Sequence, residues 1–205
     1  MIELFLIRHG LTDWNVSSRL QGWMDIPLNR TGQKQARRLA KRLTAQQFSR
    51  IYSSDLCRAT QTAEIILAAS DHKNQQPEII QCPALREISF GAWEGLTYQE
   101  ILDQDPQAAK TWQSEIASFA PPGGESLGQL VERVTNFIIK LKKEYSSSTD
   151  HTPVLLVAHG GSLQVLLCLA LGIPVEQYWQ LHLEPCSICE LKIYTEGAIL
   201  NRLNG

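Results

Sequence analysis

Short apolar runs alternate with amphipathic stretches along this chain. The runs 2–7, 50–53 and 154–158 have the length and composition of buried strands, and 78–81 is a weaker strand candidate. Between them, apolar residues recur at the three- and four-residue spacing of a helix. Helices are expected from Thr31, after Asp55 as a cap, from Thr97, from Asp105, along the stripe Val131, Val134, Phe137, Ile138 and Leu141, and over 163–171.

The C-terminal part of the pattern differs from the rest. Two strand candidates, 188–194 and 198–202, flank the turn sequence Glu196-Gly197, which is typical of a hairpin. Strands that alternate with helices indicate an α/β fold. We therefore expect a three-layer sandwich, with a mostly parallel central sheet, an antiparallel edge strand and helices on both faces.

The same pattern indicates one domain over residues 1–205. Pro121-Pro122-Gly123-Gly124 is expected to be a turn and not a linker, because helical periodicity resumes directly after it, whereas the serines at 146–148 break that helix. Residues 97–125 are rich in Trp, Pro and Gly.

Composition narrows the class of protein. The 205 residues are 43% apolar and 20% charged, which is typical of globular proteins, and the net charge of −2 offers no overall field for nucleic acid or membrane surfaces. The run 2–7 is too short for a signal peptide, and nothing approaches a membrane span of about 18 apolar residues. An odd number of cysteines, five, favours reduced thiols in a cytoplasm, and the lone pair Cys186 and Cys189 does not make a metal site.

Candidate chemistry lies where strands end. The strands 2–7 and 154–158 both run into a histidine followed by glycine, so that Arg8-His9 and His159 would lie in one crevice if these strands are neighbours. Residues 50–53 lead to a helix whose first turn carries Arg58. Two guanidinium and two imidazole groups repel one another unless an anion lies between them, and phosphate is the anion that arginine binds in bidentate fashion.

Five segments of the chain resemble conserved motifs of the histidine phosphatase superfamily, also called the phosphoglycerate-mutase-like fold. The resemblance extends over essentially the whole chain, and the ordered combination is far more specific than Arg-His-Gly alone. The segments are Arg8-His9-Gly10-Leu11-Thr12-Asp13-Trp14-Asn15, 20–28 (LQGWMDIPL), 53–63 (SSDLCRATQTA), 85–95 (LREISFGAWEG) and 158–161 (AHGG).

The resemblance implies a role for each residue. His9 would attack phosphorus and become a phosphohistidine, while Arg8, Arg58 and His159 would hold the phosphoryl oxygens. From the residues alone either histidine can be the nucleophile; the family pattern assigns His9. Glu87 would protonate the leaving oxygen and then deprotonate the attacking water. The implied substrate-binding set is Arg8, Asn15, Gln21, Gly22, Arg58, Glu87, His159 and Gly160. We expect residues 97–125, which connect the segment of Glu87 to the next long helix, to form a substrate-selecting cap.

Two other carboxylates lie close to this set in sequence. We expect Glu94 to be a structural anchor within Trp93-Glu94-Gly95, and Glu125 to be a helix-start residue. No metal and no cofactor are expected, because the arginines already supply positive charge to the phosphate.

The resemblance favours a phosphatase of small phosphomonoesters, acting as a monomer or homodimer. A phosphoglycerate mutase, which returns the phosphoryl group to its substrate, is the alternative, but mutases of this family usually carry an insertion and a longer C-terminal tail. A broad-specificity or sugar-phosphate phosphatase and a non-catalytic phosphate binder also remain. Within the superfamily, the compact length is most similar to α-ribazole phosphatases, so α-ribazole 5′-phosphate, from cobalamin synthesis, is the substrate we expect.

Overall fold

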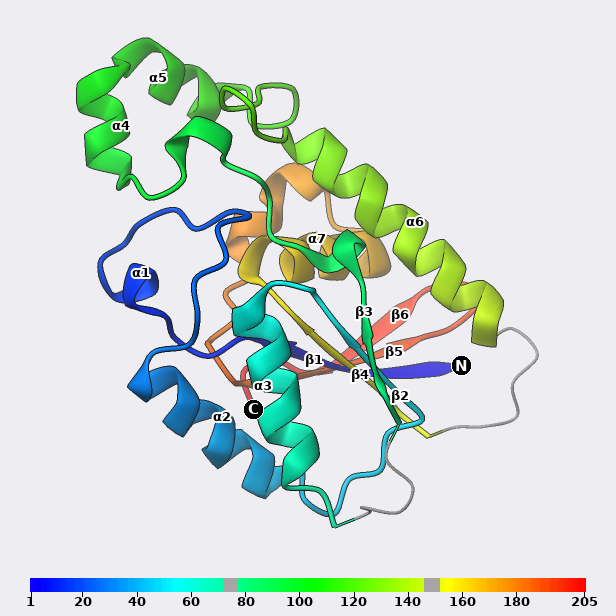
Figure 1. Ribbon diagram of the computed structural model, residues 1–205. Helices are drawn as coiled ribbons and strands as arrows, with labels where there is room; N and C mark the ends of the chain where they lie inside the picture. Colours follow the sequence, from blue (N-terminus) through cyan, green and yellow to red (C-terminus); the bar gives the residue numbers. More distant parts are fainter. Residues whose placement is uncertain (72–76, 146–151) are drawn as a thin grey trace.

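The computed structural model describes residues 1–71, 77–145 and 152–205. Within these ranges a mixed sheet of six strands crosses the molecule in the order β3-β2-β4-β1-β5-β6 (Figure 1). Strands β3, β2, β4 and β1 are parallel, whereas β5 is antiparallel to both β1 and β6. The strands are β1 (Ile2–Arg8), β2 (Arg50–Ser53), β3 (Ile79–Gln81), β4 (Val154–Ala158), β5 (Ile188–Ile193) and β6 (Ala198–Arg202). The expected α/β fold, with a mostly parallel sheet and an antiparallel C-terminal edge, is confirmed.

Helices cover both faces of the sheet (Figure 1). The helices α2 and α3 pack on one face, and α6 and α7 on the other. No helix in the described ranges combines the length and apolar content needed to cross a membrane. The helices are α1 (Asp13–Val16), α2 (Arg30–Arg42), α3 (Cys57–Ala68), α4 (Tyr98–Gln104), α5 (Pro106–Ser114), α6 (Leu127–Tyr145) and α7 (Gly160–Leu171), with short 3₁₀ turns η2 (Pro83–Leu85), η3 (Gly91–Trp93) and η4 (Val175–Gln180).

The two-residue period of the strands assigns each side chain to one of two apolar clusters. In β1, Leu4 and Leu6 pack with the cluster under α6 and α7, whereas Phe5 and Ile7 pack with the cluster under α2 and α3. Strand β4 is fully buried on both faces. Continuous apolar runs are typical of such central parallel strands, which explains why β1 and β4 stand out in the sequence.

Two expected helix starts are confirmed and one is wrong. Thr97 caps α4 with a capping box, and Asp105 caps α5. Asp55 does not cap α3: it accepts hydrogen bonds from the guanidinium of Arg86. The expected break at 146–148 lies outside the described residues.

The segment 97–125 packs with Trp93, which precedes it, in a third apolar cluster. Trp93, Ile101 and Ala109 form its buried centre, and Trp112 and Phe119 pack against them. Two backbone hydrogen bonds between Leu20 and the 95–96 segment attach this unit to the loop after β1. Figure 1 shows α4 and α5 on the side of the molecule toward which β1 and β4 run, which is where the strand-end residues lie.

Candidate active site

The two strand-end histidines lie next to each other. Strands β1 and β4 pair in parallel, with Arg8 opposite Ala158, and the His9 N–H donates to the Ala158 carbonyl over 2.9 Å. The ring centroids of His9 and His159 are 5.0 Å apart. The neighbouring β2 leads to α3, whose first turn presents Arg58 to the same place.

A small cavity of about 200 Å³ opens at these strand ends. Six of the residues expected at the site line it, together with Arg19, Leu20 and Phe90, which we did not expect there. The six are Arg8, His9, Asn15, Gln21, Arg58 and Glu87. The other three expected residues, Gly22, His159 and Gly160, are not among its lining residues but contact or adjoin residues that are.

His9 has the protonation that a nucleophile needs. Its Nδ1 lies 2.7 Å from the carbonyl oxygen of Gly10, and since a carbonyl only accepts, Nδ1 carries the proton and Nε2 keeps its lone pair. Burial, and then the nearby charge of Arg58, lower the pKa of His9 well below its ordinary value of 6.5. His9 is therefore neutral at neutral pH.

Arg58 is completely buried, and three contacts hold its guanidinium in place. One terminal nitrogen donates to the Met24 carbonyl over 2.8 Å, the other to the Gly22 carbonyl over 2.7 Å, and Nε donates to Nδ1 of His159 over 3.2 Å. Each terminal nitrogen keeps a second N–H for a ligand. Burial lowers the pKa of Arg58, and the carboxylate of Glu87 opposes this effect.

His159 has protein partners on both ring nitrogens. Since Nδ1 accepts from Arg58, the proton lies on Nε2, which donates to the Ser54 hydroxyl over 2.8 Å. Burial first, and then the charge of Arg58, lower its pKa well below 6.5. The two histidines thus differ. The contact of His9 leaves the lone pair of its Nε2 free, whereas both nitrogens of His159 are used, one of them to accept from Arg58. A direct bond from His159 to phosphate stays a prediction.

Thr12 orients two amide side chains at the cavity. Its N–H donates to Oδ1 of Asn15 over 3.0 Å, and its hydroxyl lies 3.0 Å from Oε1 of Gln21. With both oxygens turned to Thr12, the amide NH₂ groups remain as donors for a ligand. Thr12 was not among the expected residues, although its spacing to Asn15 is that of the capping box that begins α1.

Arg8 provides a sign that the cavity is built for an anion. One terminal nitrogen of Arg8 donates to the Leu183 carbonyl over 2.8 Å, and burial lowers the pKa of Arg8 while Glu87 opposes the shift. Among the described residues, Nε of Arg8 is the buried side-chain nitrogen or oxygen that has no hydrogen-bond partner. A buried donor without a partner is costly unless a ligand satisfies it.

Glu87 lies at the N-terminus of α7. Its Oε2 accepts from the Gly161 N–H over 3.2 Å, and its backbone carbonyl accepts from the Trp23 indole over 2.8 Å. The rival carboxylate Glu94 does not line the cavity, and its Oε1 accepts from the Trp23 and Phe90 backbone N–H groups. These contacts are those of the structural anchor that we expected.

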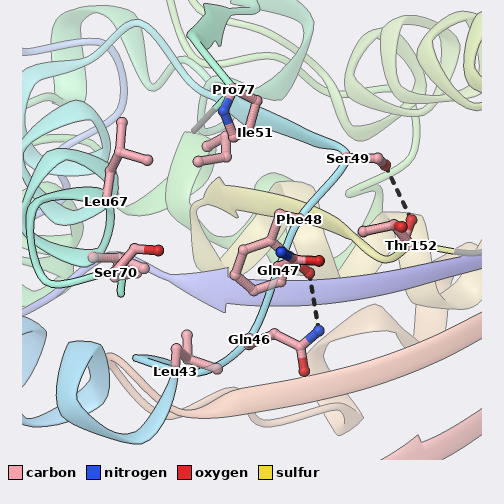
Figure 2. A pocket seen from close by; sticks show the side chains of 11 residues that line it. Leu43, Gln46, Gln47, Phe48, Ser49, Ile51, Leu67, Ser70, Pro77 and Thr152 are labelled. Atoms are coloured by element: carbon pink, nitrogen blue, oxygen red, sulfur yellow. Dashed lines mark hydrogen bonds between the residues drawn. The ribbon is translucent and has the colours of Figure 1, made fainter. Parts of the chain in front are cut away.

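A larger cavity, of about 480 Å³, lies at the other end of β2 (Figure 2). It is lined by the ends of α2 and α3 and by the chain that enters β2, including Phe48, Ser49 and Ile51. None of the described residues that line it carries a charge, so it offers no cation to a phosphate. In the parts of the chain that the structure covers, no group of three or more His, Cys, Asp or Glu side chains is arranged to hold a metal ion.

Comparisons with known proteins agree with this geometry. The profile of the histidine phosphatase superfamily, branch 1, matches residues 4–205. Phosphoserine phosphatase 1 of Hydrogenobacter thermophilus is 30% identical over 204 residues, which cover 100% of this chain and 92% of the relative. Phosphoglycerate mutase-like protein 4 of Arabidopsis thaliana is 37% identical over 166 residues, which cover 80% and 69%. The crystal structure of the α-ribazole phosphatase from Shigella flexneri matches with a TM-score of 0.90 at 28% identity, covering 100% of this chain and 96% of that one. This chain is thus an enzyme of the histidine phosphatase superfamily and belongs to its branch 1.

Proposed function

We propose that the protein hydrolyses small phosphomonoesters through a phosphohistidine at His9, without a metal. The observation that carries the proposal is the state of His9, a neutral imidazole with its lone pair on Nε2. Arg8, whose buried Nε has no hydrogen-bond partner, lines the same cavity. A nucleophile beside unsatisfied cationic donors is the arrangement that phosphoryl transfer requires.

The proposed reaction has two displacements. In the first, Nε2 of His9 forms a bond to phosphorus while the bond to the ester oxygen breaks, and Glu87 gives its proton to that oxygen. In the second, Glu87 takes a proton from water, the water oxygen attacks phosphorus, and the bond to His9 breaks. Arg8 and Arg58, with the amides of Asn15 and Gln21 turned inward by Thr12, stabilise the charge on the phosphoryl oxygens.

The proposed substrate is α-ribazole 5′-phosphate, from cobalamin synthesis. The Shigella flexneri α-ribazole phosphatase supports it, because the two folds agree over nearly their full lengths. Phosphoserine and sugar phosphates are the competing substrates, since one relative is named a phosphoserine phosphatase. The name of the Arabidopsis relative, a phosphoglycerate mutase-like protein, supports the mutase alternative.

We also propose that the protein acts in the cytoplasm. All five cysteines, which lie among the described residues, are free, as is typical of proteins in a reducing compartment.

The test is a panel of phosphomonoesters with EDTA present. We expect release of inorganic phosphate, fastest from α-ribazole 5′-phosphate, and a His9→Ala variant that releases none above background. His182→Ala is the matched control, because His182 is an exposed histidine outside the cavity, and it should keep full activity.

Two results would contradict the proposal. Full activity of His9→Ala would remove the nucleophile. Conversion of 3-phosphoglycerate to 2-phosphoglycerate without net release of phosphate would assign the protein to the mutases.

A further inference from the structure

Arg133 of α6 uses every N–H of its guanidinium. Its Nη1 donates to the carbonyls of Ala84 over 2.9 Å and Arg86 over 2.7 Å, and its Nη2 donates to the carbonyl of Glu87 over 2.8 Å. The remaining two donors, on Nε and Nη2, each reach an oxygen of Glu125 over 3.0 Å. Arginine has five N–H donors, and all five have an acceptor here.

Glu125 completes the arrangement from the other side. Its Oε2, besides binding Arg133, accepts from the Ser89 N–H over 2.9 Å, and its own N–H donates to the Ser89 carbonyl over 2.9 Å. Both members of the ion pair are largely shielded, with 17% of the Arg133 side chain and 15% of the Glu125 side chain exposed. The pair therefore holds both ends of the segment 84–89, which runs from η2 into an irregular loop.

This segment carries Glu87. The Glu87 carbonyl accepts from two side chains at once, Nη2 of Arg133 and Nε1 of Trp23. These two bonds fix the backbone from which the Glu87 side chain extends, and Glu87 lines the same cavity as His9. We propose that Arg133, neutralised by Glu125, is a positioning residue that holds Glu87 where it can protonate the leaving oxygen. This inference rests on the proposed function, since it assigns a partner to the proposed acid.

A change at Arg133 should slow the reaction by displacing the carboxylate of Glu87. Proton transfer needs the acid within hydrogen-bonding distance of the leaving oxygen, and a displacement of about 1 Å can cost about 100-fold in rate. Lysine cannot replace Arg133, because it has three donors on one nitrogen and no planar fork. The effect should be largest for esters whose leaving group has a high pKa, because such a group cannot depart without a proton.

The experiment uses Arg133→Gln and Arg133→Lys with a series of aryl and alkyl phosphates. The rate to compare is kcat/KM, which reports the first displacement and not the hydrolysis of the phosphohistidine that all substrates share. For leaving groups of high pKa, we expect kcat/KM to fall by about 10- to 100-fold in both variants. For 4-nitrophenyl phosphate, which needs little proton donation, kcat/KM should change by less than about threefold. A merely structural role would lower the rates for all leaving groups equally, and that result would overturn the inference.

A matched control comes from the same helix. Glu144 of α6 pairs with Arg50 of β2 over 3.2 Å, away from the segment 84–89. Arg50→Gln therefore breaks an ion pair between α6 and its neighbour without touching Glu87, and its rates should match those of the unmodified enzyme for every leaving group.

A double variant separates this inference from the proposed function. If Arg133 acts through Glu87, then adding Arg133→Gln to Glu87→Gln should leave the already steep dependence on leaving group unchanged, because coupled residues are not additive. Multiplied losses would overturn the inference, whereas an inactive unmodified enzyme would instead overturn the proposed function. Should Arg133→Gln fail to fold, Glu125→Gln is the second variant, because glutamine keeps one oxygen that can accept from the Arg133 guanidinium. In Glu125→Gln, the rate for leaving groups of high pKa should fall by about threefold relative to the rate for 4-nitrophenyl phosphate. An unchanged ratio would count against the inference.

Discussion

The proposed acid Glu87 lies against the start of α7, and the absence of a side chain at Gly161 permits this close approach. The N–H of Gly161 donates to Oε2 of Glu87, and a Cβ added at position 161 would lie 2.4 Å from Oε1. The carboxylate is the far end of a flexible side chain, so it would move aside and the helix would stay. Gly161→Ala should therefore lower kcat about tenfold for leaving groups of high pKa. Its thermal midpoint should not fall, because alanine favours a helix over glycine. Unchanged rates in this variant would contradict the placement of the acid.

At this scale, the sequence can predict residues whose position follows from strand order. Arg8 and His9 lie at the end of β1, and Arg58 lies in the first turn of the helix that follows β2, with β4 between these two strands. Their convergence needs only the rule that ligands bind at the carboxyl ends of parallel strands. Thr12 and Arg133 could not be found in this way. Arg133 looks in the sequence like any arginine on an amphipathic helix, since its three carbonyl partners lie more than 40 residues away.

At the scale of elements, one glutamate connects α4 to the loop after β1. Glu100 closes the capping box of α4 with Thr97, and it forms an ion pair with Arg19, which lines the cavity. Glu100→Ala removes both contacts, whereas Glu100→Gln keeps the box, because glutamine also reaches the Thr97 N–H. Loss of the hydrogen bond from the Thr97 N–H to the Glu100 side chain costs about 1 kcal/mol, while the Thr97 hydroxyl still caps the helix. Hydrogen exchange in α4 should therefore be about fivefold faster in Glu100→Ala than in Glu100→Gln. Equal exchange rates in the two variants would show that the box does not hold the helix.

Elements whose signals are local could be predicted, and those that depend on distant partners could not. The bounds of β2 and β4 and the caps at Thr97 and Asp105 follow from runs and spacings of a few residues. The cap assigned to Asp55 is wrong because two partners from elsewhere compete: Arg86 takes its carboxylate, and Asp25 accepts from the Cys57 N–H over 2.6 Å at the start of α3. Competition between residues that are far apart in the sequence cannot be predicted from a stretch of a few residues.

For the whole molecule, the buried histidines make stability depend on pH. In the folded state the pKa values of His9 and His159 are lowered well below 6.5, chiefly by burial, while in the unfolded chain both return to the ordinary value. Below about pH 6.5 the unfolded chain thus binds more protons, and the free energy of unfolding falls as pH falls. Each histidine should remove about 1.4 kcal/mol between about pH 7.5 and pH 5.5, a range that lies above the ordinary pKa of carboxylates.

Denaturant unfolding in phosphate-free buffer measures this loss. The unmodified protein should lose close to the sum of both contributions, about 2.7 kcal/mol, whereas His9→Gln should lose only half as much, because its remaining buried imidazole is that of His159. The comparison of slopes is independent of the absolute stability of the variant, so a general weakening by the substitution does not mimic the result. Equal slopes in the two proteins would mean that His9 binds as many protons in the folded state as in the unfolded chain, so that burial does not lower its pKa. Its Nε2 would then be protonated over the same pH range as that of an ordinary histidine, which would contradict the buried neutral nucleophile of the proposed reaction.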